Sequence, residues 1–167
     1  MKTVSVVAVM IRRGDEILMV KEKPNRTSKE AYWVLPAGGV EENETHIEAV
    51  FREAKEETGL DLIGEGRFIY HCDYKNERKA FKCSVKMYEF SSFEGIPCPN
   101  DPDNSIEEAK FFHVDEVINN LESLGWPVVK EPATAYLQDK SQLNQHWVYE
   151  ADNKGVYSLV ERKLYIQ

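Results

Sequence analysis

The chain has 167 residues, and 42% of them are hydrophobic, which suits one compact core and is short for two domains. Its formal net charge of −8 argues against binding of nucleic-acid polymers or anionic membranes, although a polyphosphate arriving as a metal complex is compatible with it. The chain lacks a long apolar run and a signal-peptide pattern, and its three cysteines are scattered, so we expect a cytoplasmic protein.

The N-terminal part predicts three strands. Residues 3–12 are rich in β-branched side chains without polar alternation, which is typical of a strand buried on both faces. A turn at residues 13–16 leads to a second strand at residues 17–21. The polar segment 22–30 then leads to a short strand at residues 33–35.

A helix follows, and the sequence marks both of its ends. Thr45 and Glu48 form a capping box, which predicts the start of the helix. Gly59 suits the left-handed position just past its last turn. Four apolar residues at i, i+3, i+4 and i+7 form the stripe that would dock the helix on a core: Ile47, Val50, Phe51 and Ala54.

The second half of the chain predicts a hairpin, a loop and another strand. Residues 67–74 and 80–88 alternate in polarity and form the hairpin. Residues 91–104 contain three prolines and many polar turn formers, so we expect a loop there. Residues 109–114 resume as a strand.

The remaining residues predict two helices and a last hairpin. A short helix over residues 115–121 would be capped by Asp115. A second helix runs from Trp126 to about Lys140, and residues 147–160 form the hairpin. The order of elements indicates an α/β fold with a mixed sheet covered by helices. We expect one domain over residues 1–167, with a C-terminal helix and hairpin extension over about residues 126–167.

The predicted first helix carries three glutamates that repel one another. Glu53, Glu56 and Glu57 lie at spacings of three and four, on one face and opposite the apolar stripe. Such like-charged pairs destabilise an isolated helix by roughly 0.2–0.5 kcal/mol each. A hard divalent cation such as Mg²⁺ binds carboxylate oxygens and would relieve the repulsion. A solvated acidic face is the alternative, and charge alone does not choose between the two.

The residues around these glutamates decide between the two interpretations. Residues 38–60 consist of Gly38, five residues, Glu44, seven residues, and then REAKEETGL. This segment resembles the signature of the Nudix hydrolases, a superfamily of MutT-like enzymes: G-x5-E-x7-R-E-U-x-E-E-x-G-U, with U apolar. Every fixed position matches, and Ala54 and Leu60 occupy the U positions. The preceding run WVLPAGG is also similar to the strand and turn before the family signature.

The resemblance implies a fold, an activity and a metal site. The fold is a Nudix-type α/β/α sandwich with a mixed β-sheet. The activity is Mg²⁺-dependent hydrolysis of a pyrophosphate linkage in a nucleoside diphosphate derivative, with Mn²⁺ as a possible substitute. The implied metal ligands are three carboxylates and one backbone carbonyl: Glu53, Glu56, Glu57 and Gly38.

The resemblance also implies catalytic roles for Glu53, Glu56 and Arg52. Glu53 is either a metal ligand or the base that deprotonates water, since relatives take the base from the signature or from a later loop. Glu107 and Glu108 are the candidates for a later base, with an ordinary exposed pair as the alternative. Arg52 would orient a neighbouring carboxylate through a fork-shaped pair, and Glu44 is interpreted as its structural partner.

Substrate contacts must come from outside the acidic segment. Lys21, Lys23 and Arg26 follow the second strand and are candidates for binding phosphates, although solvated loop charge is the alternative for each. The aromatic candidates for stacking on a base, which are more often core residues, are Tyr32, Trp33, Phe68, Tyr70 and Trp126. The four histidines show no metal-binding spacing and receive no role.

The substrate is the least defined part of the prediction. The markers of ADP-ribose and NADH enzymes are absent downstream of the signature, so nucleoside triphosphates, including oxidised ones, are favoured. ADP-ribose, nucleotide sugars and dinucleoside polyphosphates stay as alternatives, as does a non-catalytic domain that senses a nucleotide. The expected partner is a small nucleotide, with no nucleic-acid polymer and no membrane. The C-terminal extension would shape the substrate site or form a homodimer.

Overall fold

β1 (Lys2–Arg13) runs through the centre of the sheet, and its side chains alternate between two apolar cores. Val7, Val9 and Ile11 belong to one core, whereas Ala8 and Met10 belong to the other. The prediction of a strand buried on both faces is therefore confirmed. The requirement that both faces be covered sets the architecture, because each core must be closed by a helical layer.

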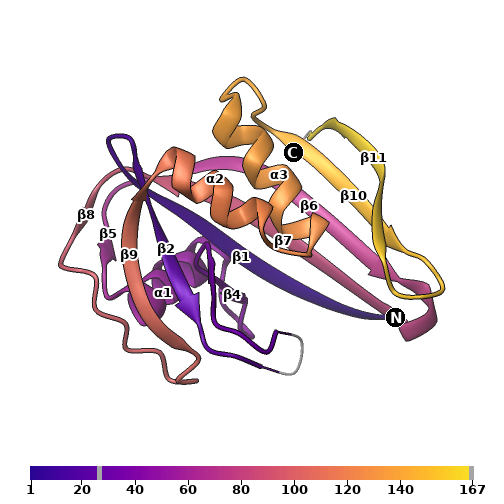
Figure 1. Ribbon diagram of the computed structural model, residues 1–167, viewed down its shortest axis with the longest axis horizontal. Helices are drawn as coiled ribbons and strands as arrows, with labels where there is room; N and C mark the ends of the chain where they lie inside the picture. The colour runs from indigo at the N-terminus through magenta and orange to yellow at the C-terminus, as the bar shows by residue number, and fades with distance from the viewer. Residues whose placement is uncertain (26–27, 166–167) are drawn as a thin grey trace.

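The computed structural model describes residues 1–25 and 28–165 (Figure 1). In chain order the further elements are β2 (Glu16–Glu22), β3 (Tyr32–Val34), β4 (Ala37–Gly39), α1 (His46–Thr58), β5 (Asp61–Leu62), β6 (Arg67–Asn76), η1 (Glu77–Lys79), β7 (Phe81–Phe90), β8 (Phe93–Glu94), β9 (Ile106–His113), α2 (Val114–Glu122), α3 (Pro127–Gln138), β10 (Gln145–Ala151) and β11 (Tyr157–Leu164). None of the helices in these described ranges has the length and apolar content needed to cross a membrane.

The large sheet contains parallel and antiparallel pairs, and its strands separate between β1 and β2. Its strand order is β11-β10-β6-β7-β1-β2-β3, with β4 on β1 and β9 on β2. The pairs β1–β7 and β6–β10 are parallel and the other pairs are antiparallel. β1 and β2 pair only next to their turn, at Arg12↔Ile17 and Arg13↔Glu16, and then diverge (Figure 1). Residues of both diverging strands, Val6 and Ala8 of β1 and Glu22 of β2, line one cavity.

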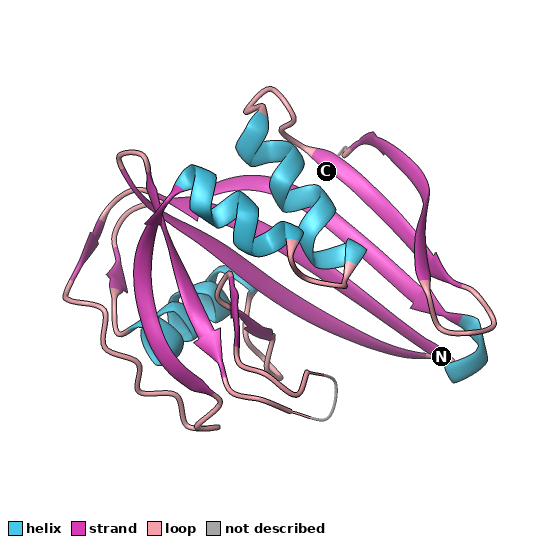
Figure 2. Ribbon diagram, in the orientation of Figure 1, coloured by secondary structure: helices cyan, strands magenta, loops and turns pink. Residues whose placement is uncertain are grey.

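Helices cover both faces of the sheet, as the colouring by secondary structure shows (Figure 2). α1 closes one core through Ala49, Val50 and Ala54. On the other face α2 contributes Val117 and Leu121, and α3 contributes Ala133 and Tyr136. The prediction of an α/β/α sandwich with a mixed sheet is confirmed.

A hydrogen bond to the carboxylate of a partly buried ion pair fastens α3 to the sheet. Arg12 donates from Nη2 to Glu89 Oε2 at 3.0 Å, and Tyr136 of α3 donates to Glu89 Oε1 at 3.2 Å. The buried Glu89 carboxylate is thus both charge-compensated and hydrogen-bonded, as burial of a charge requires.

The C-terminal elements continue the same sheet, because β10 pairs in parallel with β6.

Two local predictions about the helices are wrong. α2 begins at Val114 instead of Asp115, and His113 is its cap, with Nδ1 accepting from the Asp115 N–H at 3.2 Å. On α1, Ile47 is 41% exposed although it lies in the predicted apolar stripe, and Glu57 is buried. The helix docks by its middle and last turns, so its first turn stays exposed and the acidic residues lie beside the core instead of opposite it.

The end of α1 provides a test of how the 91–104 loop constrains the fold. Gly59 has φ +78°, and a Cβ there would overlap the carbonyl oxygen of Cys98. Gly64 has φ +82°, and a Cβ there would meet no heavy atom within 4 Å. A left-handed backbone costs about 1–2 kcal/mol for a residue other than glycine. Gly59→Ala should lower the free energy of unfolding by more than this amount, because it adds the overlap with Cys98. Gly64→Ala should lower the free energy of unfolding by this amount at most.

Urea unfolding of both variants and the wild type measures this difference. Equal losses for the two variants would mean that Cys98 does not constrain the chain at Gly59.

Candidate active site

The caps of α1 fix which residues of the signature are helical. The Thr45 hydroxyl accepts from the Glu48 N–H at 3.1 Å, and the Gly59 N–H donates to the Lys55 carbonyl at 2.9 Å. Both predicted ends of the helix are therefore confirmed. Since the apolar side of α1 is docked on the sheet, its acidic side chains are held toward β4.

Glu53 lies directly against the backbone of β4. A Cβ at Gly38 would overlap the Glu53 carboxylate, so only glycine permits this approach. Gly38 is itself held by the pairing of β4 with β1, opposite Val7. The signature glycine and the signature glutamate thus depend on each other for their position. The Gly38 carbonyl is on the same backbone, where the sequence predicted a metal ligand.

Glu57 is the most deeply buried of the three glutamates. Its side chain accepts a hydrogen bond from the Ala37 N–H at 2.9 Å, and the residue is 5% exposed. Burial raises the pKa of Glu57 to about 9, and repulsion from Glu53 and Glu22 adds to the shift. Burial also raises the pKa of Glu53, although the neighbouring Arg52 opposes this. Glu56 is more accessible, with 27% of its side chain exposed.

Arg52 links these carboxylates to the preceding loop. It binds Glu44 with two nitrogens, at 2.7 Å from Nε to Oε2 and 2.9 Å from Nη2 to Oε1, in the fork-shaped pair that the sequence suggested. This pair lowers the pKa of Glu44 to about 2. Arg52 Nη2 also donates to the Gly39 carbonyl at 2.8 Å.

The other side of the guanidinium meets the helix. Arg52 Nη1 lies 2.6 Å from Glu53 Oε1 and 3.3 Å from Glu56 Oε2. The guanidinium therefore offsets part of their charge. Among the residues that the structure describes, the carboxylate oxygens of the α1 glutamates do not come within 4.8 Å of one another as a group of three.

The donor chemistry of this site fits a hard divalent cation. The available groups are carboxylates and a backbone carbonyl, which are the ligands that Mg²⁺ and Mn²⁺ prefer. A buried carboxyl such as Glu57 becomes favourable as a carboxylate once a cation lies beside it. The residues present therefore suit the metal that the signature implies.

Asp101 in the 91–104 loop is a neighbour of the site that the sequence did not reveal. The loop follows α1, with the Cys98 N–H donating to Thr58 O at 2.8 Å and the Asn100 N–H to Glu56 O at 2.9 Å. The Asp101 charge acts on both Glu53 and Glu57. Hydrogen bonds from Ser105 and Asp103 lower the pKa of Asp101 although burial opposes this. The cluster of turn formers predicted a loop, but it did not predict that this loop would pack against the end of α1.

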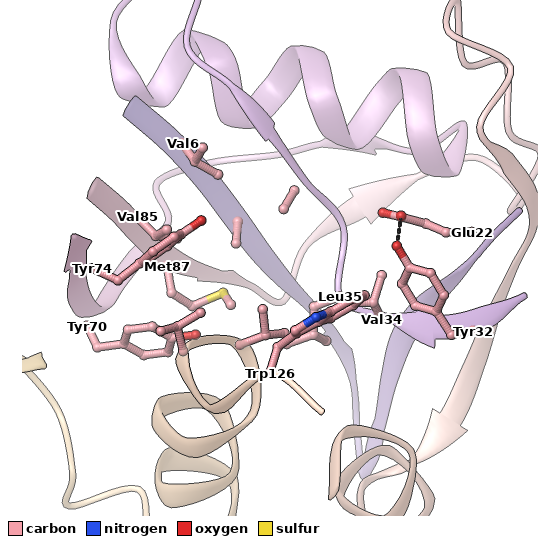
Figure 3. A pocket seen from close by; sticks show the side chains of 14 residues that line it. Val6, Glu22, Tyr32, Val34, Leu35, Tyr70, Tyr74, Val85, Met87 and Trp126 are labelled. Carbon is pink, nitrogen blue, oxygen red and sulfur yellow. Dashed lines mark hydrogen bonds between the residues drawn. The ribbon is translucent and has the colours of Figure 1, made fainter. Parts of the chain in front are cut away.

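An apolar cavity of about 240 Å³ adjoins the acidic helix (Figure 3). Its walls come from the sheet and from α3, and Ala37 is part of the lining. At one side Tyr32 donates to a carboxylate oxygen of Glu22 (Figure 3). Burial and this hydrogen bond raise the pKa of Tyr32 to about 12. Ala37 therefore joins the two parts of the site, since its N–H binds Glu57 and its side chain lines the cavity.

Three of the predicted stacking residues line this cavity: Tyr32, Tyr70 and Trp126. The other two lie elsewhere, because Trp33 packs on Phe112 and Phe68 packs on Tyr88. Glu22 is a lining residue that the sequence analysis did not single out, since one carboxylate at the end of a strand carries no recognisable pattern.

The predicted phosphate-binding lysines are engaged by other residues. Lys21 Nζ lies 3.9 Å from Glu107 Oε2, and Lys23 Nζ donates to Asn104 Oδ1 at 2.9 Å. Glu108 is exposed on β9, paired in register with Lys21. None of these side chains is part of the cavity lining. Arg26 lies outside the described residues.

Solved structures with the same fold include Nudix and MutT proteins. The mutator MutT protein from Bacillus halodurans superposes with a TM-score of 0.68 at 16% identity, covering 96% of each chain, a likeness of fold alone. The MutT Nudix hydrolase from Burkholderia pseudomallei has a TM-score of 0.59 at 26% identity, covering 69% of this chain and 86% of its own. A model of the NUDIX domain matches residues 1–133. The chain belongs to the Nudix family.

Relatives with known names differ in how much of the chain they match. Phosphatase NudJ from Escherichia coli O1:K1 / APEC is 29% identical over 133 residues, 78% of this chain and 80% of that protein. The 8-oxo-dGDP phosphatase NUDT18 of Mus musculus is 46% identical over 55 residues, 33% of this chain and 16% of that protein. Nudix hydrolase 2 of Arabidopsis thaliana is 29% identical over 117 residues, and the match spans 41% of its length.

The pKa of Glu57 predicts a pH-dependent effect on stability without metal. Because burial raises this pKa from 4.5 to about 9, ionising Glu57 opposes folding. The loss is absent below pH 4.5, grows by about 1.4 kcal/mol per pH unit above it, and levels off near the folded pKa. In EDTA, Glu57→Gln should therefore gain stability over the wild type as the pH rises from 5 to 8.

Urea unfolding across this pH range measures the difference in free energy of unfolding between Glu57→Gln and the wild type. Glu48→Gln, at an exposed position of the same helix, is the control. A difference that does not change with pH would show that ionising Glu57 does not oppose folding.

Proposed function

We propose that this protein is a Mg²⁺-dependent pyrophosphohydrolase whose substrates are nucleoside triphosphates, oxidised ones included, with Mn²⁺ as a substitute metal. The observation that carries this proposal is the dual position of Ala37, between Glu57 of the acidic helix and the apolar cavity. A nucleotide whose phosphates lie along α1 would have its base beside aromatic walls. Site and fold thus support the binding of both halves of a nucleotide.

The acidic residues of the signature would hold the metal. We assign Glu53, Glu56, Glu57 and the Gly38 carbonyl as its ligands. Bound there, Mg²⁺ would neutralise phosphate charge and lower the pKa of a water. The chain contributes a rigid arrangement, since Gly38 and Glu53 fix each other and Ala37 orients Glu57.

As the alternative to ligating the metal, Glu53 is suited to accept a proton from the attacking water. A general base works best when its pKa lies near the working pH, and burial raises the pKa of Glu53 in that direction. Arg52 Nη1 donates to Oε1, so we assign the proton to Oε2. Arg52 is then a positioning residue, anchored by Glu44 and the Gly39 carbonyl. Glu107, Glu108 and Asp101 are the alternative bases.

The cavity would bind the base of the nucleotide. Tyr32, Tyr70 and Trp126 offer aromatic surface, and the Glu22 carboxylate supplies a polar group at the edge. We assign the phosphate contacts to Lys21, Lys23 and Arg26, and the first two would have to leave Glu107 and Asn104 to make them. Trp126, Val128 and Val129 bring α3 into the cavity wall, which supports one domain over residues 1–167 with the C-terminal extension as part of the site.

The names of the relatives support a nucleotide substrate. They include an 8-oxo-dGDP phosphatase and, at 44% identity over 48 residues, an RNA pyrophosphohydrolase from Bartonella henselae. Oxidised nucleotides are therefore the first substrates to test, with ADP-ribose, nucleotide sugars and dinucleoside polyphosphates as the comparison set. We also propose a cytoplasmic location, and a homodimer stays a prediction.

A panel of these nucleotides with Mg²⁺ or Mn²⁺, with products identified by mass, tests the function directly. Glu56→Gln should lower turnover at least about 100-fold, because even outer partners of a metal site contribute 10–100-fold. Glu48→Gln, exposed on the same helix, should keep full activity. A panel without turnover, or an active Glu56→Gln enzyme, would reject the proposal.

Two adjacent glycines offer a sharper test of the geometry. Gly38→Ala would push the Glu53 carboxylate away, whereas a Cβ at Gly39 meets only the Ser5 carbonyl, at 4.0 Å. Gly38→Ala should therefore reduce turnover at saturating Mg²⁺ about tenfold or more. Gly39→Ala should change it little, and steady-state kinetics of the two variants decides. A similar loss in both would show that the contact with Glu53 is not what matters.

A further inference from the structure

The sheet carries a second group of metal-type ligands, remote in sequence from the signature. His71 and Asp73 lie on β6, and His146 lies on the neighbouring strand β10. In the parallel register His146 is opposite His71. Because Tyr70, Cys72 and Trp147 point into the core under α3, the three ligand-type side chains all face the opposite side of the sheet.

The ligand atoms of these side chains converge. His146 Nε2 lies 2.9 Å from Asp73 Oδ2, and His71 Nε2 lies 3.1 Å from Asp73 Oδ1. All three ligand atoms are within 4.8 Å of one another, and among the described residues no other group of histidines, cysteines and acids meets that limit. The imidazoles are nearly parallel, with centroids 4.5 Å apart.

The group is shielded and incompletely satisfied. Its side chains are 12–17% exposed, and the Tyr165 ring lies edge-on against both imidazoles. His71 Nδ1 is buried without a hydrogen-bond partner among the described residues, and the nearest partner of Asp73 Oδ1 in this group is His71 Nε2, at 3.1 Å. A cation bound between the imidazoles and the carboxylate would compensate the charge of this largely buried Asp73.

We propose that His71, Asp73 and His146 form a binding site for a borderline divalent transition metal such as Zn²⁺. Two imidazole nitrogens and one carboxylate oxygen are a donor set that Zn²⁺ accepts, with solvent completing the coordination, whereas Mg²⁺ prefers oxygen alone. The site differs in chemistry from the all-oxygen site on α1. It joins strands β6 and β10, so the metal would hold the C-terminal extension to the rest of the sheet.

Nearby polar groups set the affinity of the site. Ser84 Oγ lies 2.6 Å from His71 Nε2 and is a candidate further oxygen donor. Lys82 Nζ lies 3.9 Å from Asp73 Oδ2, and its charge competes with a cation. Lys82→Gln should therefore bind Zn²⁺ more tightly than the wild type, the opposite direction from loss of a ligand.

Titration of the metal-free protein with Zn²⁺ by calorimetry tests the site, using the Glu56→Gln variant as background so that the α1 site is weakened. One Zn²⁺ per chain should bind, and Asp73→Asn or His146→Ala should weaken it at least about 100-fold. His113→Asn serves as the matched control, because His113 lies on β9 and Asn preserves its capping role. Mg²⁺ should not compete.

A second readout does not depend on enzymatic activity. Zn²⁺ should raise the melting temperature of the Glu56→Gln protein through binding to the folded state, and this shift should vanish in His146→Ala. The inference is overturned if Zn²⁺ affinity is the same in Asp73→Asn, His146→Ala and His113→Asn, or if Zn²⁺ does not bind to the Glu56→Gln protein. Neither outcome bears on the hydrolase proposal, which the nucleotide panel decides.

Discussion

The hydrogen bond from the Ala37 N–H to the Glu57 carboxyl group joins the parts of this protein that the proposed chemistry needs together. It connects the last turn of α1 to β4, which is paired with the central strand β1. The same short strand places Gly38 against Glu53 and Ala37 at the cavity. Together with the packing of Ala49, Val50 and Ala54 on the core, this bond fixes the acidic helix relative to the cavity wall.

Holding Glu57 there is unfavourable, and the rest of α1 must compensate. Burial of the carboxyl raises its pKa to about 9, and each unit of such a shift corresponds to about 1.4 kcal/mol. Ala49, Val50 and Ala54 dock the same helix on the core, and Arg52 offsets charge at Glu53 and Glu56. The apolar contacts thus hold an acidic surface that a cation would relax, which is a physical reason for a fixed binding site.

The sequence predicted those features that are local in the chain. The capping box at Thr45, the left-handed Gly59 and the pairing of Arg52 with Glu44 depend on residues within about two helical turns, and all three are present. The exposure of Ile47 could not be predicted, because periodicity gives an angle around the helix but not where the sheet ends. Asp101 and Glu22 reach the site through the tertiary fold, so no spacing in the sequence reveals them.

The histidines are a second case in which spacing in the sequence does not reveal neighbours in the fold. A search for His-x-x-x-His spacing finds ligands on one helix, whereas His71 and His146 are 75 residues apart and become neighbours only because β10 pairs with β6. That pairing also bears on the cavity, since Tyr149 of β10 donates to Glu131 of α3 at 2.7 Å and α3, with its cap residue Trp126, forms part of the cavity wall. The position of β10 therefore influences the wall through α3. A metal that fixed β10 to β6 would act on the shape of the proposed base-binding side, while the cation proposed on α1 would act on the proposed phosphate side. The two proposed sites would therefore have separable effects on the same substrate.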